Sequence, residues 1–89
     1  MSLSQNQLTG EIPSEIGNLV NLNSLNLVYN QLTGEIPSEI GNLTNLFTFR
    51  LYYNLLSGEI PQEVCDLIES NNLDMWYILN GNNLINTCE

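Results

Sequence analysis

Apolar residues recur at fixed positions along the chain, and the segment from Leu22 to Leu46 carries one complete set. The apolar positions of this set are Leu22, Leu25, Leu27, Leu32, Ile36, Ile40, Leu43 and Leu46. Leu25 and Leu27 are separated by one residue, which predicts a short β-strand whose alternate side chains point inward. The polar and turn residues that follow predict a corner, a second short extended piece and one helical turn.

The set repeats with a period of 24 residues. Residues 6–19 and 30–43 are both Asn-Gln-Leu-Thr-Gly-Glu-Ile-Pro-Ser-Glu-Ile-Gly-Asn-Leu, and residues 54–67 are a degenerate third copy. A unit of this length cannot bury its own apolar residues, so they become buried only when successive coils stack. The period therefore predicts a solenoid in which the strands of successive coils pair side by side in a parallel sheet.

The corners of each coil carry residues with special backbone or hydrogen-bonding properties. Asn6, Asn30 and Asn54 recur at the bend after the strand, where side-chain amides satisfy turning backbone and bond to the next coil. Glycines recur in register at positions 10, 34 and 58, and prolines at 13, 37 and 61. The four residues 38–41 that follow the second proline are too few for a stable α-helix and predict a single 3₁₀ or α turn.

Together these positions resemble a known repeat. The pattern Leu22-x-x-Leu25-x-Leu27-x-x-Asn30-x-Leu32-Thr33-Gly34-x-Ile36-Pro37 is similar to the plant-type leucine-rich repeat, and the resemblance extends over residues 3–67. It implies an α/β solenoid, a right-handed superhelix with a parallel sheet on the concave side and short 3₁₀ or helical turns on the convex side. We expect one domain over residues 1–89, with repeats at 1–24, 25–48 and 49–72 and a capping segment at 73–89.

The C-terminal segment departs from the repeat. Leu73 and Met75 still fall at the strand positions, but the expected Asn-x-Leu-Thr-Gly sequence is absent. A terminal repeat must cover the last apolar layer, so this segment is predicted to be a cap. Asn80-Gly81 indicates a tight turn, and we interpret it as a hairpin that folds back over the end.

The two cysteines lie in and beside this cap. Cys65 replaces the glycine found at positions 17 and 41, and Cys88 lies near the C-terminus. Similar cysteine pairs close the C-terminal caps of proteins that the chain resembles, which implies a Cys65–Cys88 disulfide. Two reduced thiols or a metal site are the alternatives, and two thiols without a histidine fall short of a zinc ligand set.

The first coil has no predicted cap. Its apolar residues are Leu3, Leu8, Ile12, Ile16 and Leu19. Burial of a large apolar side chain is worth roughly 1.5–3 kcal/mol, so an uncovered layer is costly. Either the chain is a fragment of a longer repeat protein, or the open coil pairs with another copy in a homodimer.

A partner-binding surface is predicted on the concave face. The residues between and just after the strand leucines are Val28, Tyr29, Arg50, Tyr52, Tyr53, Asp74, Trp76 and Tyr77. Aromatic side chains are typical interface anchors, so we expect a protein or peptide ligand, or another copy of the chain, to bind here. The alternative is structural, because aromatic rings also stack across strands and Arg50–Asp74 can be an exposed ion pair of little value.

The net charge and the residue types present exclude several classes of function. Ten acidic residues against one Arg give a net charge of −9, which disfavours binding to nucleic acid or anionic membranes. Without His or Lys, and without a phosphate-binding loop, the chain is predicted to be no enzyme and to need no cofactor. No apolar run predicts membrane insertion. The cysteine pair and the sequon Asn42-Leu43-Thr44 favour an extracellular or cell-surface location.

Ice or polysaccharide-surface binding is a minor alternative. It depends on Thr9, Thr33 and Ser57, which the 24-residue period would stack as a regular polar column.

Overall fold

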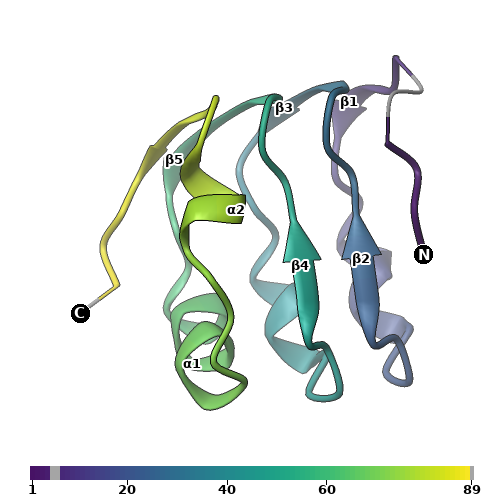
Figure 1. Ribbon diagram of the computed structural model, residues 1–89, viewed down its shortest axis with the longest axis vertical. Coiled ribbons are helices and arrows are strands. Elements are labelled where there is room, and N and C mark those ends of the chain that lie inside the picture. The colour runs from purple at the N-terminus through teal and green to yellow at the C-terminus, as the bar shows by residue number, and fades with distance from the viewer. Residues whose placement is uncertain (5–6, 89) are drawn as a thin grey trace.

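Successive coils lie side by side in the computed structural model, which describes residues 1–4 and 7–88 (Figure 1). Strand β2 (Ser24–Asn26) pairs in parallel with β4 (Thr48–Arg50), and Ser24 lies opposite Thr48. An isolated parallel bridge between Ser2 and Asn26 extends this sheet to the first coil. The 24-residue offset between β2 and β4 confirms the predicted solenoid.

The second extended pieces form a sheet of their own. Strands β1 (Thr9–Glu11), β3 (Gln31–Gly34), β5 (Leu55–Glu59) and β6 (Asn83–Ile85) are all parallel, in the order β1-β3-β5-β6. The register is offset by 22 residues between β1 and β3 and between β3 and β5, where Thr9 pairs with Gln31 and Thr33 pairs with Leu55, and by 26 residues between β5 and β6. The predicted column of Thr9, Thr33 and Ser57 is therefore wrong, because Gln31 lies opposite Thr9 and Leu55 lies opposite Thr33.

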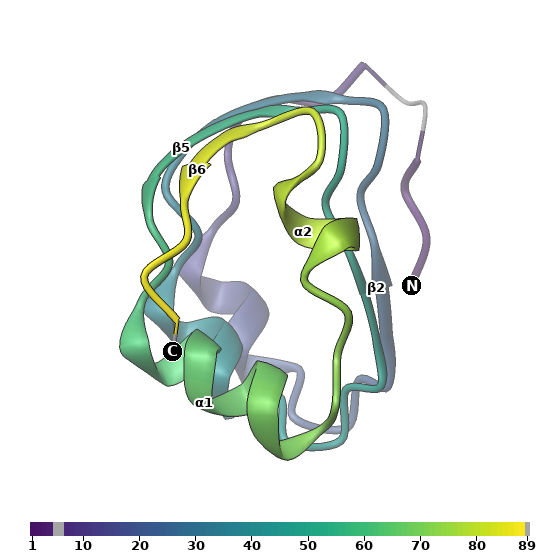
Figure 2. The ribbon, with the colours of Figure 1, turned by 60° about the vertical axis from the view of Figure 1, so that its left-hand side comes forward.

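One helical turn follows each proline, as predicted. The 3₁₀ helices η1 (Ser14–Asn18) and η2 (Ser38–Asn42) begin after prolines with φ of −72° and −65°. The third coil instead forms the longer α-helix α1 (Gln62–Ser70), whose buried residues are Val64, Cys65, Leu67 and Ile68. This apolar stripe has helical spacing, so burial favours continuation of the helix. Figure 2 shows these helices along one side of the stacked coils, separate from β5 and β6.

Glycine allows the helical turns to pack closely. A Cβ atom at Gly17 would lie 2.6 Å from the Glu39 carbonyl oxygen, and one at Gly41 would lie 2.8 Å from the Glu63 Cβ. Each glycine thus meets the glutamate of the following coil without room for a side chain. Within the described residues no further coil packs on α1, so Cys65 has the space for its sulfur that the earlier positions lack.

Buried asparagine side chains join the coils. Asn54 Nδ2 donates to the Leu51 carbonyl in its own coil and to the Leu27 carbonyl in the preceding coil, at 3.0 and 2.9 Å. Its Oδ1 accepts from the Leu32 amide at 3.1 Å. Asn30 makes the corresponding bonds to Leu27, Leu3 and Leu8. The predicted role of this column is therefore confirmed for Asn30 and Asn54, whereas Asn6 lies outside the described residues.

The cap has a different structure from the predicted one. The chain does not form a third strand at Leu73 and Met75 but turns into helix α2 (Trp76–Leu79). Gly81, with φ of +72°, then leads into β6, which pairs in parallel with β5. The tight turn is confirmed and the hairpin is wrong, because the chain continues in the direction of the coil rather than folding back.

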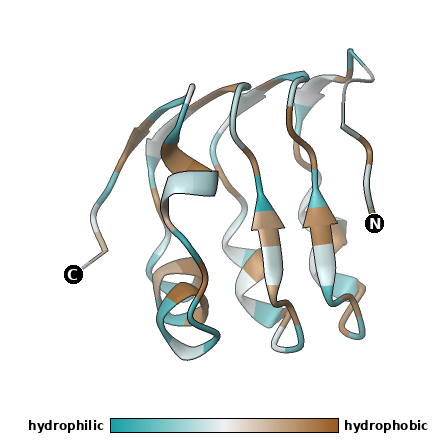
Figure 3. Ribbon diagram, viewed as in Figure 1, coloured by the Kyte–Doolittle hydropathy of each residue, from teal (hydrophilic) through white to brown (hydrophobic). Residues whose placement is uncertain are grey.

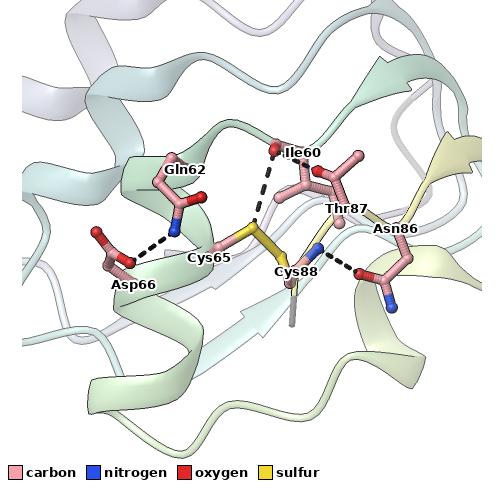
Figure 4. Close-up of a disulfide and its surroundings, with 7 residues drawn as sticks. All are labelled: Ile60, Gln62, Cys65, Asp66, Asn86, Thr87 and Cys88. Atoms are coloured by element: carbon pink, nitrogen blue, oxygen red, sulfur yellow. Dashed lines mark hydrogen bonds between the residues drawn. A yellow bond between two sulfur atoms is a disulfide. The ribbon is translucent and has the colours of Figure 1, made fainter.

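A disulfide attaches the cap to the last coil. Cys65 and Cys88 are bonded, with a Cα–Cα distance of 5.3 Å (Figure 4). The Thr87 hydroxyl donates to the Ile60 carbonyl at 3.0 Å beside this bond. The predicted Cys65–Cys88 pair is confirmed, so neither sulfur is a free thiol.

The core is one continuous cluster between the two sheets and the helices. Its fully buried residues include Leu25, Ile40, Leu43 and Leu51, and α2 contributes Ile78. Figure 3 shows that apolar and polar residues alternate along β2 and β4, so one face of each strand is buried. Among the described helices, none is long and apolar enough to cross a membrane.

Substitution of Gly41 by Ala tests the coil contact. We expect Gly41→Ala to lower the free energy of unfolding by about 1–3 kcal/mol, because the new methyl group meets Glu63 and the coils must separate. Urea unfolding measures this loss. The control is Asn42→Ala, an exposed neighbour, which should change stability by less than about 0.5 kcal/mol. Equal stability of the two variants would contradict the close packing.

Candidate functional site

Five aromatic side chains gather where the last regular coil meets the cap. The aromatic cluster consists of Tyr29, Tyr52, Tyr53, Trp76 and Tyr77. Tyr29 follows β2, Tyr52 and Tyr53 follow β4, and α2 supplies Trp76 and Tyr77. The structure therefore brings together the five aromatic residues that the sequence predicted, although two of them lie on a helix instead of a strand.

The rings are in mutual contact. Tyr29 and Tyr53 stack, with ring centroids 4.9 Å apart and planes at 28°. Tyr52 lies 5.7 Å from Tyr29 and 5.5 Å from Trp76, so it links the stacked pair to the cap. Trp76 and Tyr77 meet edge to face at 5.2 Å. Such contacts limit ring rotation, and they hold the cluster in a defined shape.

Much of the cluster remains open to solvent. Trp76 is 53% exposed and Tyr29 is 47% exposed. Tyr52 and Tyr77 are half-buried, because neighbouring rings cover them. Contact between rings and access to solvent are thus combined, which is the arrangement that a preformed binding surface needs.

Two of these tyrosines have an unfavourable backbone conformation. Tyr29 and Tyr53 both have φ of +58°, in the left-handed region that bulky residues rarely adopt. Each directly precedes a buried asparagine whose amide bonds hold the corner in place. Backbone strain of this kind occurs preferentially at binding and catalytic sites. The repeat pattern identifies both positions as corners but does not reveal their conformation.

The Arg50–Asp74 ion pair is not formed. The Arg50 guanidinium carbon instead lies 5.0 Å from the centre of the Tyr77 ring. Asp74 Oδ1 accepts from the Trp76 backbone amide at 3.0 Å and so supports the start of α2. Both side chains line a hollow of about 170 Å³ between β4 and the cap.

Val28 does not lie on the exposed surface. It is 5% exposed, so the prediction that it faces solvent beside Tyr29 is wrong. Val28 follows the buried Leu27, and both lie beyond the end of β2 at the start of the corner, where strict alternation of inward and outward side chains ends. The repeat pattern also assigns no role to Phe47, which is 67% exposed beside the same hollow. The equivalent positions 23 and 71 are both asparagine, so the phenylalanine at position 47 is the signal in the sequence that could have identified this residue.

A second candidate surface lies at the first coil. Leu3 and Leu19 are exposed, Leu8 and Ile16 are half-buried, and all four line a groove of about 340 Å³. Ile12 is 4% exposed, so the expectation that it is uncovered is wrong. It packs into the core cluster that includes Leu32 and Ile36.

A family model described as Leucine Rich Repeat matches residues 1–19, 21–43 and 45–67. These three matches follow the coils of the structure and cover more than half of the chain. No curated protein matches the chain at the level of sequence.

Several solved plant structures are similar to the chain. The Arabidopsis receptor kinase HAESA, in complex with the peptide hormone IDA and the co-receptor SERK1, is 53% identical over 72% of this chain, with a TM-score of 0.68. The BIR2 ectodomain from Arabidopsis thaliana is 33% identical over 89%, with a TM-score of 0.71. A plant ice-binding protein is 39% identical over 74%, with a TM-score of 0.67. The chain spans only 11%, 39% and 21% of these three chains, respectively.

Two substitutions at Tyr29 test whether the corner is strained. Both Tyr29→Asn and Tyr29→Val remove the ring, but Asn adopts the left-handed conformation readily and Val does not. We therefore expect the Asn variant to be more stable than the Val variant by about 1–2 kcal/mol in urea unfolding. If the two variants unfold at the same urea concentration, the left-handed corner stores no strain.

Proposed function

The chain belongs to the leucine-rich repeat family, in its plant type, and we propose that it is a non-catalytic module that binds a peptide or protein through the aromatic cluster. The observation that carries this proposal is a connected set of five rings at one corner of the solenoid, of which Tyr29, Tyr53 and Trp76 are exposed. Rings that are already held by their neighbours lose little conformational freedom when a ligand binds.

The solved relatives support the class of ligand. HAESA was solved with a peptide hormone and a co-receptor protein, and BIR2 as an ectodomain. This chain spans only part of either protein, so the similarity does not assign to it the particular partners of HAESA or BIR2. What the similarity supports is recognition of a peptide or protein by the same repeat architecture.

The proposed location is extracellular or at the cell surface. The Cys65–Cys88 disulfide supports it, because disulfides form and persist in oxidising compartments. The exposed Asn42 and Thr44 of the sequon are consistent with the same setting.

Selection from a displayed random peptide library tests this function and requires no named partner. The disulfide-bonded protein should select peptides whose affinity falls at least about tenfold in the double variant Tyr52→Ala with Trp76→Ala. Ser57→Ala, an exposed position on β5, is the matched control and should bind the same peptides normally. Peptides that bind the double variant as well as the original protein would refute the assignment of the site.

Self-association through the first coil is a second candidate function. The exposed Leu3 and Leu19 beside the apolar groove support it, since contact with a second copy would remove both from water. The two functions are compatible, because the groove and the aromatic cluster share none of their residues.

Light scattering after size-exclusion chromatography tests this candidate. We expect a mass of twice 10.0 kDa that falls to the monomer value on dilution, and a monomer at all concentrations for Leu19→Glu. The control Leu55→Glu places the same charge at an exposed leucine of β5 and should remain a dimer. A monomeric original protein at high concentration would exclude self-association.

Ice binding gains support from the similar plant ice-binding protein. The register of the second sheet argues against it, because Thr33 lies opposite Glu11 and Leu55 instead of opposite another hydroxyl residue. A peptide or protein ligand is therefore the function that the geometry favours.

A further inference from the structure

The aromatic cluster already binds one cation of its own chain. The guanidinium of Arg50 lies over the ring of Tyr77, 5.0 Å from its centre. Within residues 1–4 and 7–88, no carboxylate oxygen lies within 4.0 Å of this guanidinium. The described electrostatic partner of Arg50 is thus an aromatic face, whose electron density attracts cations.

The other rings of the cluster offer further surface of the same kind. Trp76 and Tyr52 lie 5.5 Å apart with their planes at 49°, and Tyr52 and Tyr53 lie 5.6 Å apart at 69°. Planes at such angles do not cover one another fully. Trp76, the best of the aromatic side chains at attracting cations, is 53% exposed.

The charge of the chain selects a positive ligand for these rings. The protein carries a net charge of −9, with Arg50 as its one basic side chain. Asp74 is exposed beside Trp76, where one of its oxygens accepts from the Trp76 amide. A potential of this sign concentrates cations near the surface and repels anionic ligands.

We propose that the ligand of the aromatic cluster is a peptide segment that carries an arginine, whose guanidinium packs against Trp76 and Tyr52. Arginine fits better than lysine, because the planar guanidinium stacks on aromatic rings and is more weakly hydrated than an ammonium group. Arg50 on Tyr77 is the same contact made within the chain. This inference rests on the proposed binding function and names the chemistry of its ligand.

Trp76 allows a direct measurement, because it is the single tryptophan of the chain and its fluorescence reports on the site. The probes are two short Gly/Ser peptides with blocked ends, one with two arginines and one with two citrullines. Citrulline has nearly the shape of arginine but no charge. We expect the arginine peptide to change the fluorescence and to bind roughly threefold to thirtyfold more tightly than the citrulline peptide, which is the range for a cation over an aromatic ring.

Two variants separate the rings from general attraction to an acidic protein. Tyr52→Leu keeps the net charge and should abolish the preference for arginine, whereas Glu59→Gln on β5 changes the net charge and should keep the preference. Trp76→Leu, measured by calorimetry, provides a second test if Tyr52→Leu unfolds. Agmatine, which has a guanidinium but no peptide backbone, should bind more weakly than the arginine peptide.

The results distinguish this inference from the proposed function. Equal binding of the two peptides, binding of neither, or a preference that persists in the folded Tyr52→Leu and Trp76→Leu variants would each overturn the arginine ligand. Agmatine that binds as tightly as the arginine peptide would overturn the assignment to a peptide. In each of these cases, library peptides that require Tyr52 and Trp76 would still support a peptide-binding module with another ligand chemistry.

Discussion

The asparagine side chain that bridges neighbouring coils is the interaction on which the rest of the structure depends. An amide buried at a corner must have its donors and its acceptor satisfied, and Asn54 achieves this only with its own coil and the preceding coil in place. These hydrogen bonds therefore fix three features together: the spacing of the coils, the sharp bend, and the direction in which the chain leaves the strand. The left-handed backbone of Tyr29 and Tyr53 follows from the same constraint, since each precedes one of these asparagines. The aromatic cluster is thus positioned by the buried amides.

Most of the solenoid can be predicted from the sequence, because the same residue types recur at the same positions of each coil. Leu25 and Leu27 reveal the strand, the prolines reveal the helical turns, and Cys65 marks the last regular coil where glycine is no longer required. The second sheet is harder to predict, because its strands β1, β3 and β5 pair at an offset of 22 residues, whereas the sequence repeats every 24 residues. The burial of Val28 and Ile12 is hard to predict for a related reason, since burial at a corner or at the first coil depends on what packs from outside the repeat.

The 24-residue period of the sequence does not continue through the cap. Asn82 donates to the carbonyls of Ile78 and Leu51 and accepts from the Leu56 amide, which is the bonding pattern of Asn30 and Asn54. It lies 28 residues after Asn54 instead of 24, because α2 occupies the intervening chain. The sequence Asn82-Asn83-Leu84 carries the local Asn-x-Leu signal, but a fixed period does not find it. The same inserted helix brings Trp76 and Tyr77 to Tyr52, so the candidate site arises where the repeat ends.

The identical contacts at Gly17 and Gly41 have a consequence for how such a protein changes in length. Gly17 meets Glu39 and Gly41 meets the equivalent Glu63 of the next coil, so a further copy of the unit inserted between them would be complementary to both of its neighbours. The identical amino-acid sequences at residues 6–19 and 30–43 show that two adjacent coils already consist of the same unit. An insertion between Cys65 and Cys88 would instead move the two cysteines apart and would move the aromatic rings of the cap away from Tyr52. The architecture thereby allows variation in the number of interior coils while the cap and its surface are inherited as one block.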